Sequence, residues 1–399
     1  MEQIYLDHNA TTPVDSRVLE AMRPYFSDQF GNSASLHGPG QRARVAVDDA
    51  RRLLGNLLNC QSSELIFTSG GTEADNLALM GVARAFNFKG HLVVSGIEHR
   101  ATLETVGLLE EMGLRSTIVP PREDGVVDVD EIVRAFEDDT ILVSLMLANN
   151  ETGTLQPVAE VGGEAQKRGI IVHCDAVQAL GKIPFELREL NADLVVFSAH
   201  KMHGPKGVGL LYSRFGTRMA GLISGGRQEY GKRGGTTNVP GVVGLAEAVR
   251  LVFEQHNGFP DKLRSWTDRF VTGLSEALPG VALNGHPTHR LPGTVNVAFE
   301  GVQSSLLVQM LDMSGVYASP GSACQSGAAE PSHVLLAMGL GEERARSSVR
   351  FSFGRLNREE QVDPAIAAVA DCVQRFRQTV GSGGREINGR LDRTASYAG

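Results

Sequence analysis

The sequence predicts a layered α/β domain built on a mostly parallel sheet, followed by a smaller α+β domain. From about residue 65 to residue 213, short apolar runs alternate with longer amphipathic stretches. The runs are rich in Val, Ile and Leu and too short for buried helices, which is typical of strands buried on both faces of a parallel sheet. Beyond Gly280 the alternation gives way to separate strand and helix patterns, which indicates a second domain.

Seven apolar runs are expected to form the strands of the large sheet. They lie at residues 64–69, 91–96, 114–120, 140–148, 170–176, 193–199 and 207–213. Amphipathic helices are expected between them at residues 72–86, 101–113 and 158–169. Two long helical patterns, at 238–256 and 260–278, predict a connector. In the second domain we expect strands at 293–301 and 347–354, and helices at 304–315 and 358–379.

These patterns divide the chain into four segments. The expected divisions are an N-terminal segment that joins the small domain at residues 1–20, a large domain at 21–258, a small domain carrying Cys324 at 259–381, and a tail at 382–399. The tail is rich in Gly and polar residues and has little to bury, so we expect it to be flexible.

Composition excludes several classes of protein. Hydrophobic residues make up 42% of the 399 residues and charged residues 21%, which is ordinary for a soluble globular protein. The net charge of −8 argues against a nucleic-acid groove, since such surfaces are basic. No apolar run approaches the roughly 20 residues of a membrane helix, and the first residues lack the pattern of a signal peptide. The four cysteines form no CxxC pair, so neither disulfides nor a zinc site are expected, and a cytoplasmic location fits best.

Polar and titratable residues follow five of the seven predicted strands. They occur in the segments SGGTEADN at 69–76, EHRAT at 98–102, NNETGT at 149–154, DAVQ at 175–178 and SAHKMHGPKG at 198–207. In open α/β sheets, ligands bind outside the carboxyl ends of the strands. We therefore expect these five strand ends to converge on one site.

The segment from Ser69 to Thr72 suits an anion. Small residues between a strand and a helix let backbone N–H groups at the helix N-terminus face a phosphate. The segment is not a Walker phosphate-binding loop, because its spacing differs and no Lys follows it. A helix cap formed by Ser69 or Thr72 is the alternative.

Asp175 ends an apolar run, where an ionised carboxylate is costly to bury without a partner. The protonated ring nitrogen of pyridoxal phosphate is such a partner. A core Asp that caps the next turn is the alternative. Gln178 lies one helical turn further on and could reach the ring oxygen of the same cofactor.

Lys201 directly follows the predicted strand at 193–199. A lysine in a partly desolvated pocket can have its pKa lowered and form a Schiff base. Lys206 is the rival, but the surrounding GPKG sequence predicts a tight turn. Ser198 and His200 flank Lys201 and could donate hydrogen bonds to a phosphate.

His99 could stack on a planar ring or move a proton near neutral pH, although a lone His is more often structural. The rival interpretation is a metal site, as in an α/β metallohydrolase. Its ligands would be His99, His173, Asp175, His200 and His203. Strand alternation places His173 and Asp175 on one face but supplies no third ligand nearby.

Cys324 lies in the segment YASPGSACQSGAAEPSH, which has little to pack and predicts an exposed, mobile loop. Free Cys is usually buried, so an exposed one is a candidate nucleophile, with an incidental surface thiol as the alternative.

Arg350 is a charge inside an apolar strand and could pair with a substrate carboxylate or form a structural ion pair. The Gly-rich, basic segment at 225–238 could bring Thr236 to a phosphate.

Taken together, these segments resemble the cysteine desulfurases of the NifS/IscS type. That group belongs to the fold-type I, aspartate aminotransferase-like (class V) pyridoxal-phosphate enzymes. The resemblance covers about nine tenths of the chain. Its most specific pieces are YLD-x-NATT, SGGTEADN, NNETGT, DAVQ, SAHK-x-HGPKG, EYG-x-R-x-GT and GSAC-x-S followed by EPSHV.

The resemblance implies how the cofactor is held. Lys201 would form the Schiff base with pyridoxal phosphate and move protons at the substrate. Asp175 would pair with the pyridine nitrogen, Gln178 with the ring oxygen, and His99 would stack on the ring. The phosphate and its surroundings would be contacted by Gly71, Thr72, Ser198, His200, Asn150 and, from the other subunit of a homodimer, Thr236.

The resemblance also implies the reaction. Asn150 and Arg350 would grip the carboxylate of L-cysteine, and Cys324 would attack its sulfur, leaving L-alanine and a persulfide. Sulfur would then pass to acceptor proteins such as an iron–sulfur scaffold. No resident metal is implied, although Cys324 could be a transient iron–sulfur ligand. Neither direct nucleic-acid contact nor membrane contact is expected.

Departures from the family pattern are few. Gly71 stands where Ala or Cys is frequent, and His8 where Asn or Tyr is frequent. Pro320 and Gln325 replace Ser and Thr beside the nucleophile, which leaves the reach of the loop and its partner open. A selenocysteine lyase, another class V enzyme such as an aminotransferase, and a binding protein that lost catalysis are the alternatives.

Overall fold

The computed structural model describes residues 3–184, 186–254, 258–320 and 330–394, with side chains to residue 379. The chain divides into two compact units. The small unit comprises Met1–His8, Lys262–Asn284 and Gly293–Gly399, and the large unit comprises Asn9–Asp261 and Gly285–Pro292.

The large unit contains a seven-stranded sheet in the order β2-β8-β7-β6-β5-β3-β4. Its strands are β2 (Leu65–Thr68), β3 (His91–Ser95), β4 (Arg115–Val119), β5 (Thr140–Ser144), β6 (Ile171–Asp175), β7 (Leu194–Ser198) and β8 (Gly209–Ser213). Neighbouring strands are parallel except at β8, which is antiparallel to both β2 and β7. The mostly parallel sheet and its seven predicted strands are confirmed.

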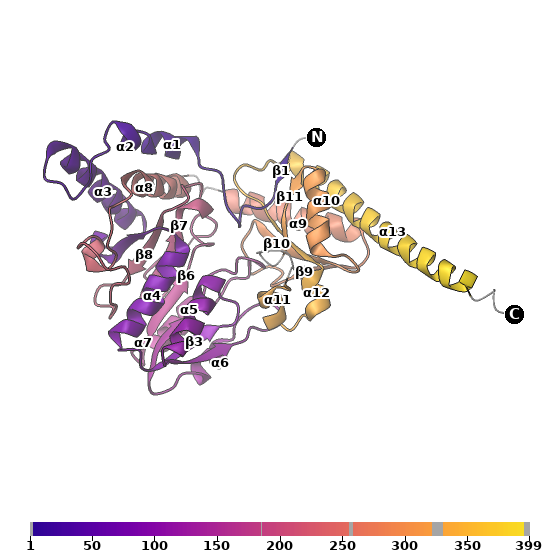
Figure 1. Ribbon diagram of the computed structural model, residues 1–399, viewed down its shortest axis with the longest axis horizontal. Helices are drawn as coiled ribbons and strands as arrows, with labels where there is room; N and C mark the ends of the chain where they lie inside the picture. Colours follow the sequence, from indigo (N-terminus) through magenta and orange to yellow (C-terminus); the bar gives the residue numbers. More distant parts are fainter. Residues whose placement is uncertain (1–2, 185, 255–257, 321–329, 395–399) are drawn as a thin grey trace. The chain divides into compact units, whose positions relative to one another are not determined.

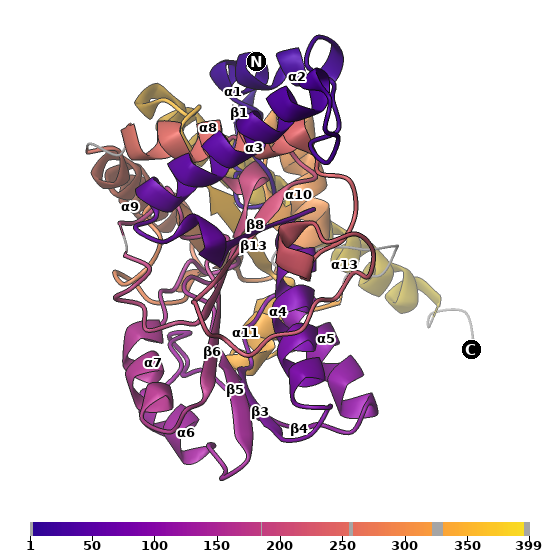
Figure 2. The same cartoon turned by 90° about the vertical axis from the view of Figure 1, so that its left-hand side faces the viewer.

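Helices cover both faces of this sheet. Those of the large unit are α1 (Ser16–Met22), α2 (Pro24–Ser27), α3 (Gly38–Leu57), α4 (Gly71–Ala85), α5 (Arg100–Glu111), α6 (Val129–Arg134), α7 (Val158–Gln166) and α8 (Val239–Glu254). Figure 2 shows α4 and α5 on one face, and α6 and α7 on the other. Helix α4 buries Ala74, Leu77, Ala78 and Val82, whose spacing places them on one helical face against the sheet.

The small unit contains an antiparallel sheet in the order β12-β13-β10-β9. Its strands are β9 (Val281–Asn284), β10 (Thr294–Phe299), β12 (Ser319–Pro320) and β13 (Ser348–Ser352). A parallel pair is formed by β1 (Ile4–Tyr5) and β11 (Val316–Tyr317). The helices are α9 (Phe259–Ala277, which starts in the large unit), α10 (Ser304–Met313), α11 (His333–Ala337), α12 (Glu342–Arg346) and α13 (Val362–Thr394).

Helix α13, yellow in Figure 1, continues to Thr394, past the end near Thr379 that composition predicted. Relative to Ala, a Gly residue destabilises a helix by only about 1 kcal/mol, whereas a Pro residue destabilises it by about 3 kcal/mol. Residues 380–394 contain four Gly but no Pro. Their composition therefore disfavours the helix without blocking it.

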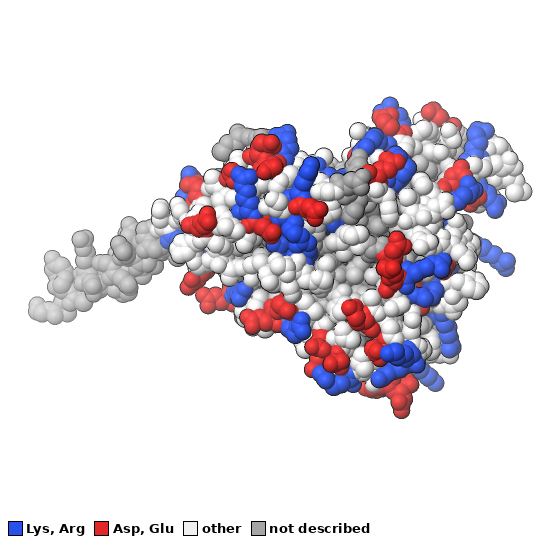
Figure 3. Space-filling view, turned by 180° about the vertical axis from the view of Figure 1, so that it is seen from behind, with Lys and Arg blue, Asp and Glu red and all other residues white. Residues whose placement is uncertain are grey.

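Charges of both signs are interspersed on the face drawn in Figure 3. Arg115 pairs with both Glu137 and Asp139 at the surface of the large unit. Among the helices that the structure describes, none has the length and apolar content to cross a bilayer.

A buried ion pair joins α3 to the turn that precedes α8. The guanidinium of Arg51 donates to Glu229 at 2.7 Å and to the carbonyl of Leu65 at 2.5 Å, and it lies 4.4 Å from the centre of the Phe67 ring. The second oxygen of Glu229 accepts the backbone N–H of Phe67 at 2.9 Å. Because Glu229 has a φ of 46°, these bonds hold a left-handed backbone conformation in place.

We predict that Arg51→Ala lowers the free energy of unfolding by about 3–5 kcal/mol, because it leaves Glu229 buried without its charge partner. Arg52 is the matched control. It is exposed and pairs with Asp49 at the surface, so Arg52→Ala should cost at most about 1 kcal/mol. Denaturant unfolding of both variants measures the difference, and equal losses would refute a special role for the buried pair.

Candidate active site

The start of α4 forms a cradle of backbone groups. Gly70 is the N-cap of this helix and makes no side-chain cap, so the first N–H groups of the helix are open to a ligand. Gly209 in β8 packs directly on Gly70, and a Cβ at position 209 would lie 2.6 Å from the carbonyl carbon of Gly70. At Gly71 a Cβ would meet the side chain of Val177 at 3.1 Å. The predicted SGGT segment thus lies at a helix N-terminus, without the cap that was the alternative.

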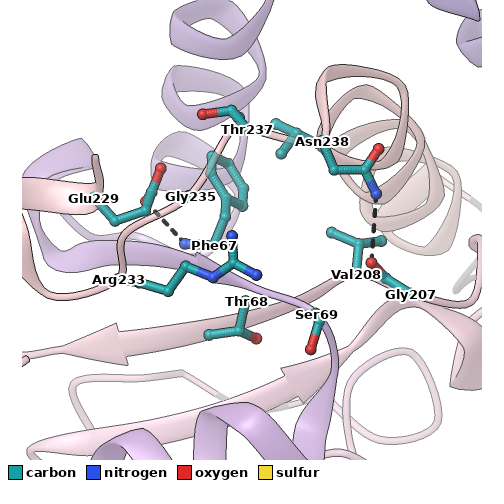
Figure 4. A pocket seen from close by; sticks show the side chains of 11 residues that line it. Phe67, Thr68, Ser69, Gly207, Val208, Glu229, Arg233, Gly235, Thr237 and Asn238 are labelled. Atoms are coloured by element: carbon teal, nitrogen blue, oxygen red, sulfur yellow. Dashed lines mark hydrogen bonds between the residues drawn. The ribbon is translucent and has the colours of Figure 1, made fainter. Parts of the chain in front are cut away.

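Glu73 fixes the segment that enters this helix. Its carboxylate accepts the backbone N–H of Ser69 at 2.9 Å and the guanidinium of Arg233 at 2.8 Å. Burial raises the pKa of Glu73, but hydrogen bonds from Arg233 and Ser69 outweigh burial, so the net shift is downward. Ser69 and Arg233 also line a pocket with Gly235, Thr237 and Asn238, drawn in Figure 4. The loop after Glu229 is therefore tied to the helix N-terminus.

The end of β7 adds positive charge beside this cradle. Ser198 is the last residue of the strand and is buried, and His200 follows it in a short turn. Burial, and then the charges of Lys201, Lys206 and Lys182, lower the pKa of His200 to about 4. His200 is thus neutral at pH 7 in surroundings that favour an anion.

The first residues of the large unit hold Lys201. Its Nζ donates to the carbonyls of Asn9 at 2.7 Å and Ala10 at 2.8 Å. The Asn9 carbonyl also accepts the Gln178 amide at 3.0 Å, and the Asn9 side chain donates to the carbonyl of Asn150 at 3.2 Å. Asn9 therefore connects three predicted site residues. Lys206, the rival to Lys201, is exposed on the following turn.

His99 caps helix α5. Its Nδ1 accepts the backbone N–H of Ala101 at 3.1 Å, so the proton of the neutral ring is on Nε2. Desolvation lowers the pKa of His99. The negative charge of Asp175 raises this pKa, and the positive charge of Lys201 lowers it further. The ring is thus within electrostatic range of both Asp175 and Lys201.

Asp175 ends β6 next to further buried acids. It is 5% exposed, and one of its oxygens accepts the backbone N–H of Val177 at 2.8 Å. No other hydrogen bond to this carboxylate is made by the residues that the structure describes. Asp75 and Glu98 lie close enough for the charge of Asp175 to raise the pKa of each. Asp175 therefore offers a buried negative charge without a hydrogen-bonded cation.

These features fit pyridoxal phosphate. The uncapped start of α4 and its cationic surroundings suit the phosphate, and the buried Asp175 suits a protonated ring nitrogen. Lys201 follows β7, which lies in the sheet between β6, which ends in Asp175, and β8, whose Gly209 packs on Gly70. In the described ranges, no cluster of His, Cys, Asp or Glu is arranged to hold a metal ion. His173 instead binds Ser144 at 2.9 Å, and His203 binds the carbonyl of Pro13 at 3.0 Å.

Arg350 belongs to the small unit, where it pairs with Asp7 at 2.9 Å, so the structural ion pair considered from the sequence is present. Thr236 is exposed in the loop before α8. Cys324 and Gln325 lie outside the described residues.

Sequence reasoning missed the linking role of Asn9 and the partnership of Lys182. Nζ of Lys182 donates to the side chain of Asn9 at 2.7 Å and also to Gln178. The NATT motif was a signal for Asn9, but Lys182 lies in no motif. Asp75 and Glu98 stand inside quoted motifs, and only the fold shows that they are buried together.

We predict that Glu98→Gln flattens the dependence of stability on pH. Burial, partly offset by hydrogen bonds from Ser95 and Met146, raises the pKa of Glu98 from 4.5 to about 7. The folded protein thus retains a proton that the unfolded chain loses above about pH 4.5, so stability falls as pH rises toward 7, by up to roughly 3 kcal/mol.

Glu104→Gln, on the exposed face of α5, is the control and should keep the wild-type slope. Denaturant unfolding at several pH values between 4.5 and 8 measures the slopes. An unchanged slope in Glu98→Gln would contradict the buried titration.

The chain is similar to known proteins over nearly its whole length. Residues 4–364 match the family model described as aminotransferase class-V. The cysteine desulfurase IscS of Methanosarcina thermophila is 45% identical over 378 residues, which cover 94% of this chain and 93% of that relative. The cysteine desulfurase IscS of Anaeromyxobacter dehalogenans is also 45% identical, over 379 residues, with the same coverage.

Solved structures agree with this relationship. A NifS-like protein has a TM-score of 0.88 and 39% identity, covering 93% of this chain and 99% of its own. A NifS-like protein from Rickettsia africae has a TM-score of 0.84 and 29% identity, covering 94% and 100%. The chain therefore belongs to the aminotransferase class-V family of pyridoxal-phosphate enzymes, as a relative of its cysteine desulfurases.

Proposed function

We propose that this protein is a cysteine desulfurase, which converts L-cysteine to L-alanine and transfers the sulfur to Cys324 as a persulfide. The observation that carries the proposal is the buried Asp175 at a strand end beside Lys201 and an uncapped helix N-terminus. The relatives named cysteine desulfurase support the choice of substrate.

The residues of the large unit would bind and orient the cofactor. The N-terminus of α4, with Gly71 and Thr72, would hold the phosphate together with Ser198 and His200. Asp175 would hold the ring nitrogen, Gln178 the ring oxygen, and His99 would stack on the ring. When bound, pyridoxal phosphate withdraws electrons from the substrate's carbons and so weakens its C–S bond. Lys201 would hold the cofactor and then move protons at the substrate.

The other cysteines support the choice of Cys324 as nucleophile. Burial, and then the charge of Glu64, raise the pKa of Cys60 to about 12, so almost no thiolate forms there at neutral pH. Cys174 is fully buried in β6 and Cys372 is buried in α13. Attack by the Cys324 thiolate would form the S–S bond as the C–S bond of the substrate breaks.

The finer assignments are part of the same proposal. Asn150 and Arg350 would bind the substrate carboxylate, which would compete with Asp7 for the guanidinium of Arg350. Thr236, exposed next to Gly235 and Thr237 of the pocket in Figure 4, would reach the phosphate of a second subunit in a homodimer. Cytoplasmic acceptor proteins, such as an iron–sulfur scaffold, would receive the sulfur.

The test measures alanine and sulfide released from L-cysteine with a dithiol reductant. Wild type should release equal amounts, and Cys324→Ala should lose at least about 1,000-fold of this activity while it still binds the cofactor. Cys60→Ala is the matched control and should keep the activity. Full activity in Cys324→Ala would contradict the proposed nucleophile, and a keto acid product in place of alanine would indicate an aminotransferase.

A further inference from the structure

Behind Asp175, buried polar side chains form a chain from Glu98 to Asp75. The hydroxyl of Ser144 donates to Glu98 at 3.3 Å and lies 2.9 Å from Nδ1 of His173. The other ring nitrogen of His173, Nε2, lies 3.3 Å from Oδ1 of Asp75. Exposure is at most 1% for each of these four residues, so water does not screen their charges.

The hydrogen-bond donors decide where the protons lie. Ser144 has one O–H, and if Glu98 receives it, the Ser144 oxygen must accept the N–H of His173 Nδ1. Desolvation lowers the pKa of His173, so its ring is neutral and Nε2 is then a bare acceptor. Facing this acceptor at 3.3 Å, Asp75 is attractive only if its oxygen carries a proton.

The charges around Asp75 also indicate that its carboxyl group carries a proton. The neighbours of Asp75 are Asp175 and His173 from β6, and Glu98 lies close to the same two residues. Three ionised carboxylates around them would repel one another. Glu98 accepts hydrogen bonds from Ser95 at 2.6 Å and from the N–H of Met146 at 2.7 Å, so it tolerates a charge. Within the described part of the chain, neither Oδ1 of Asp75 nor Nε2 of His173 has a hydrogen-bond partner, although these two buried atoms face each other at 3.3 Å.

We propose that Asp75 is a positioning residue that stays protonated and donates to His173, so that Asp175 keeps the negative charge that faces the cofactor's ring nitrogen. His99, Lys201 and Cys174 are further titratable groups near Asp175. His99 directly follows Glu98, whereas Lys201 follows β7, on the other side of β6 in the sheet. A second ionised carboxylate at Asp75 would instead repel the negative charge on Asp175. This inference rests on the proposed role of Asp175.

The first test compares the same substitution at two carboxyl groups. Asn resembles a protonated Asp, because its amide can donate to Nε2 of His173, so Asp75→Asn should bind pyridoxal phosphate within about threefold of wild type. Asp175→Asn removes the charge itself and should weaken binding roughly 10- to 100-fold. Absorbance titration of the cofactor-free protein gives both dissociation constants. Equal weakening in the two variants would overturn the proposal.

The second test measures the proton directly and does not depend on activity or cofactor. Infrared spectra of the full chain, labelled with ¹³C at the Asp side-chain carboxyl, should show a protonated carboxyl band at pH 7 with and without cofactor. This band should disappear in Asp75→Asn and remain in Asp139→Asn, a surface control. If Asp75→Asn does not fold, ¹⁵N spectra of the wild type should still show His173 neutral with its proton on Nδ1.

Absence of the Asp75 band, or a doubly protonated His173 ring, would contradict the proposal. The protonated carboxyl band of Asp75 could instead be present while Asp175→Asn binds the cofactor normally. That result would support the proton on Asp75 but contradict the proposed role of Asp175. The two failures are thus distinguishable.

Discussion

A buried negative charge at the end of β6 is the constraint on which the rest of the site depends. Parallel strands bring their carboxyl ends to one edge, and Asp175 is 5% exposed at that edge. Such a carboxylate is stabilised by a cationic partner and by keeping the nearby Asp75 neutral. A cofactor with a protonated ring nitrogen would supply the partner, and the proposed proton on Asp75 would remove a competing negative charge.

The same edge is completed by segments far apart in the sequence. Asn9 and Ala10 receive the Lys201 ammonium, and the loop after Glu229 is tied to the start of α4 by Arg233 and Glu73. Each link is a polar contact made in a largely buried setting, where the loss of one partner leaves the other unsatisfied. Positioning in this site therefore depends on the whole large unit, and the Arg51–Glu229 pair contributes although it lies away from Lys201.

Sequence patterns predicted the large sheet because its strands are buried on both faces and read as continuous apolar runs. They did not predict that β8 runs antiparallel, because the direction of a strand leaves no mark on its composition. Asp175 and Lys201 could be found from their place after a strand. The Asn9–Lys201 contact spans 192 positions, and the His173–Asp75 contact joins a strand to a helix, so only the tertiary fold reveals them.

The central claim is that one lysine, Lys201, holds pyridoxal phosphate beside Asp175. Its most direct measurement is reduction of the cofactor-loaded protein with borohydride, followed by digestion and mass analysis of the peptides. Reduction fixes the cofactor to the lysine that carries it. The structure predicts the added pyridoxyl phosphate mass on Lys201 alone. The same mass on the exposed Lys206 or on Lys182, or no modified lysine in a protein that binds the cofactor, would contradict the claim.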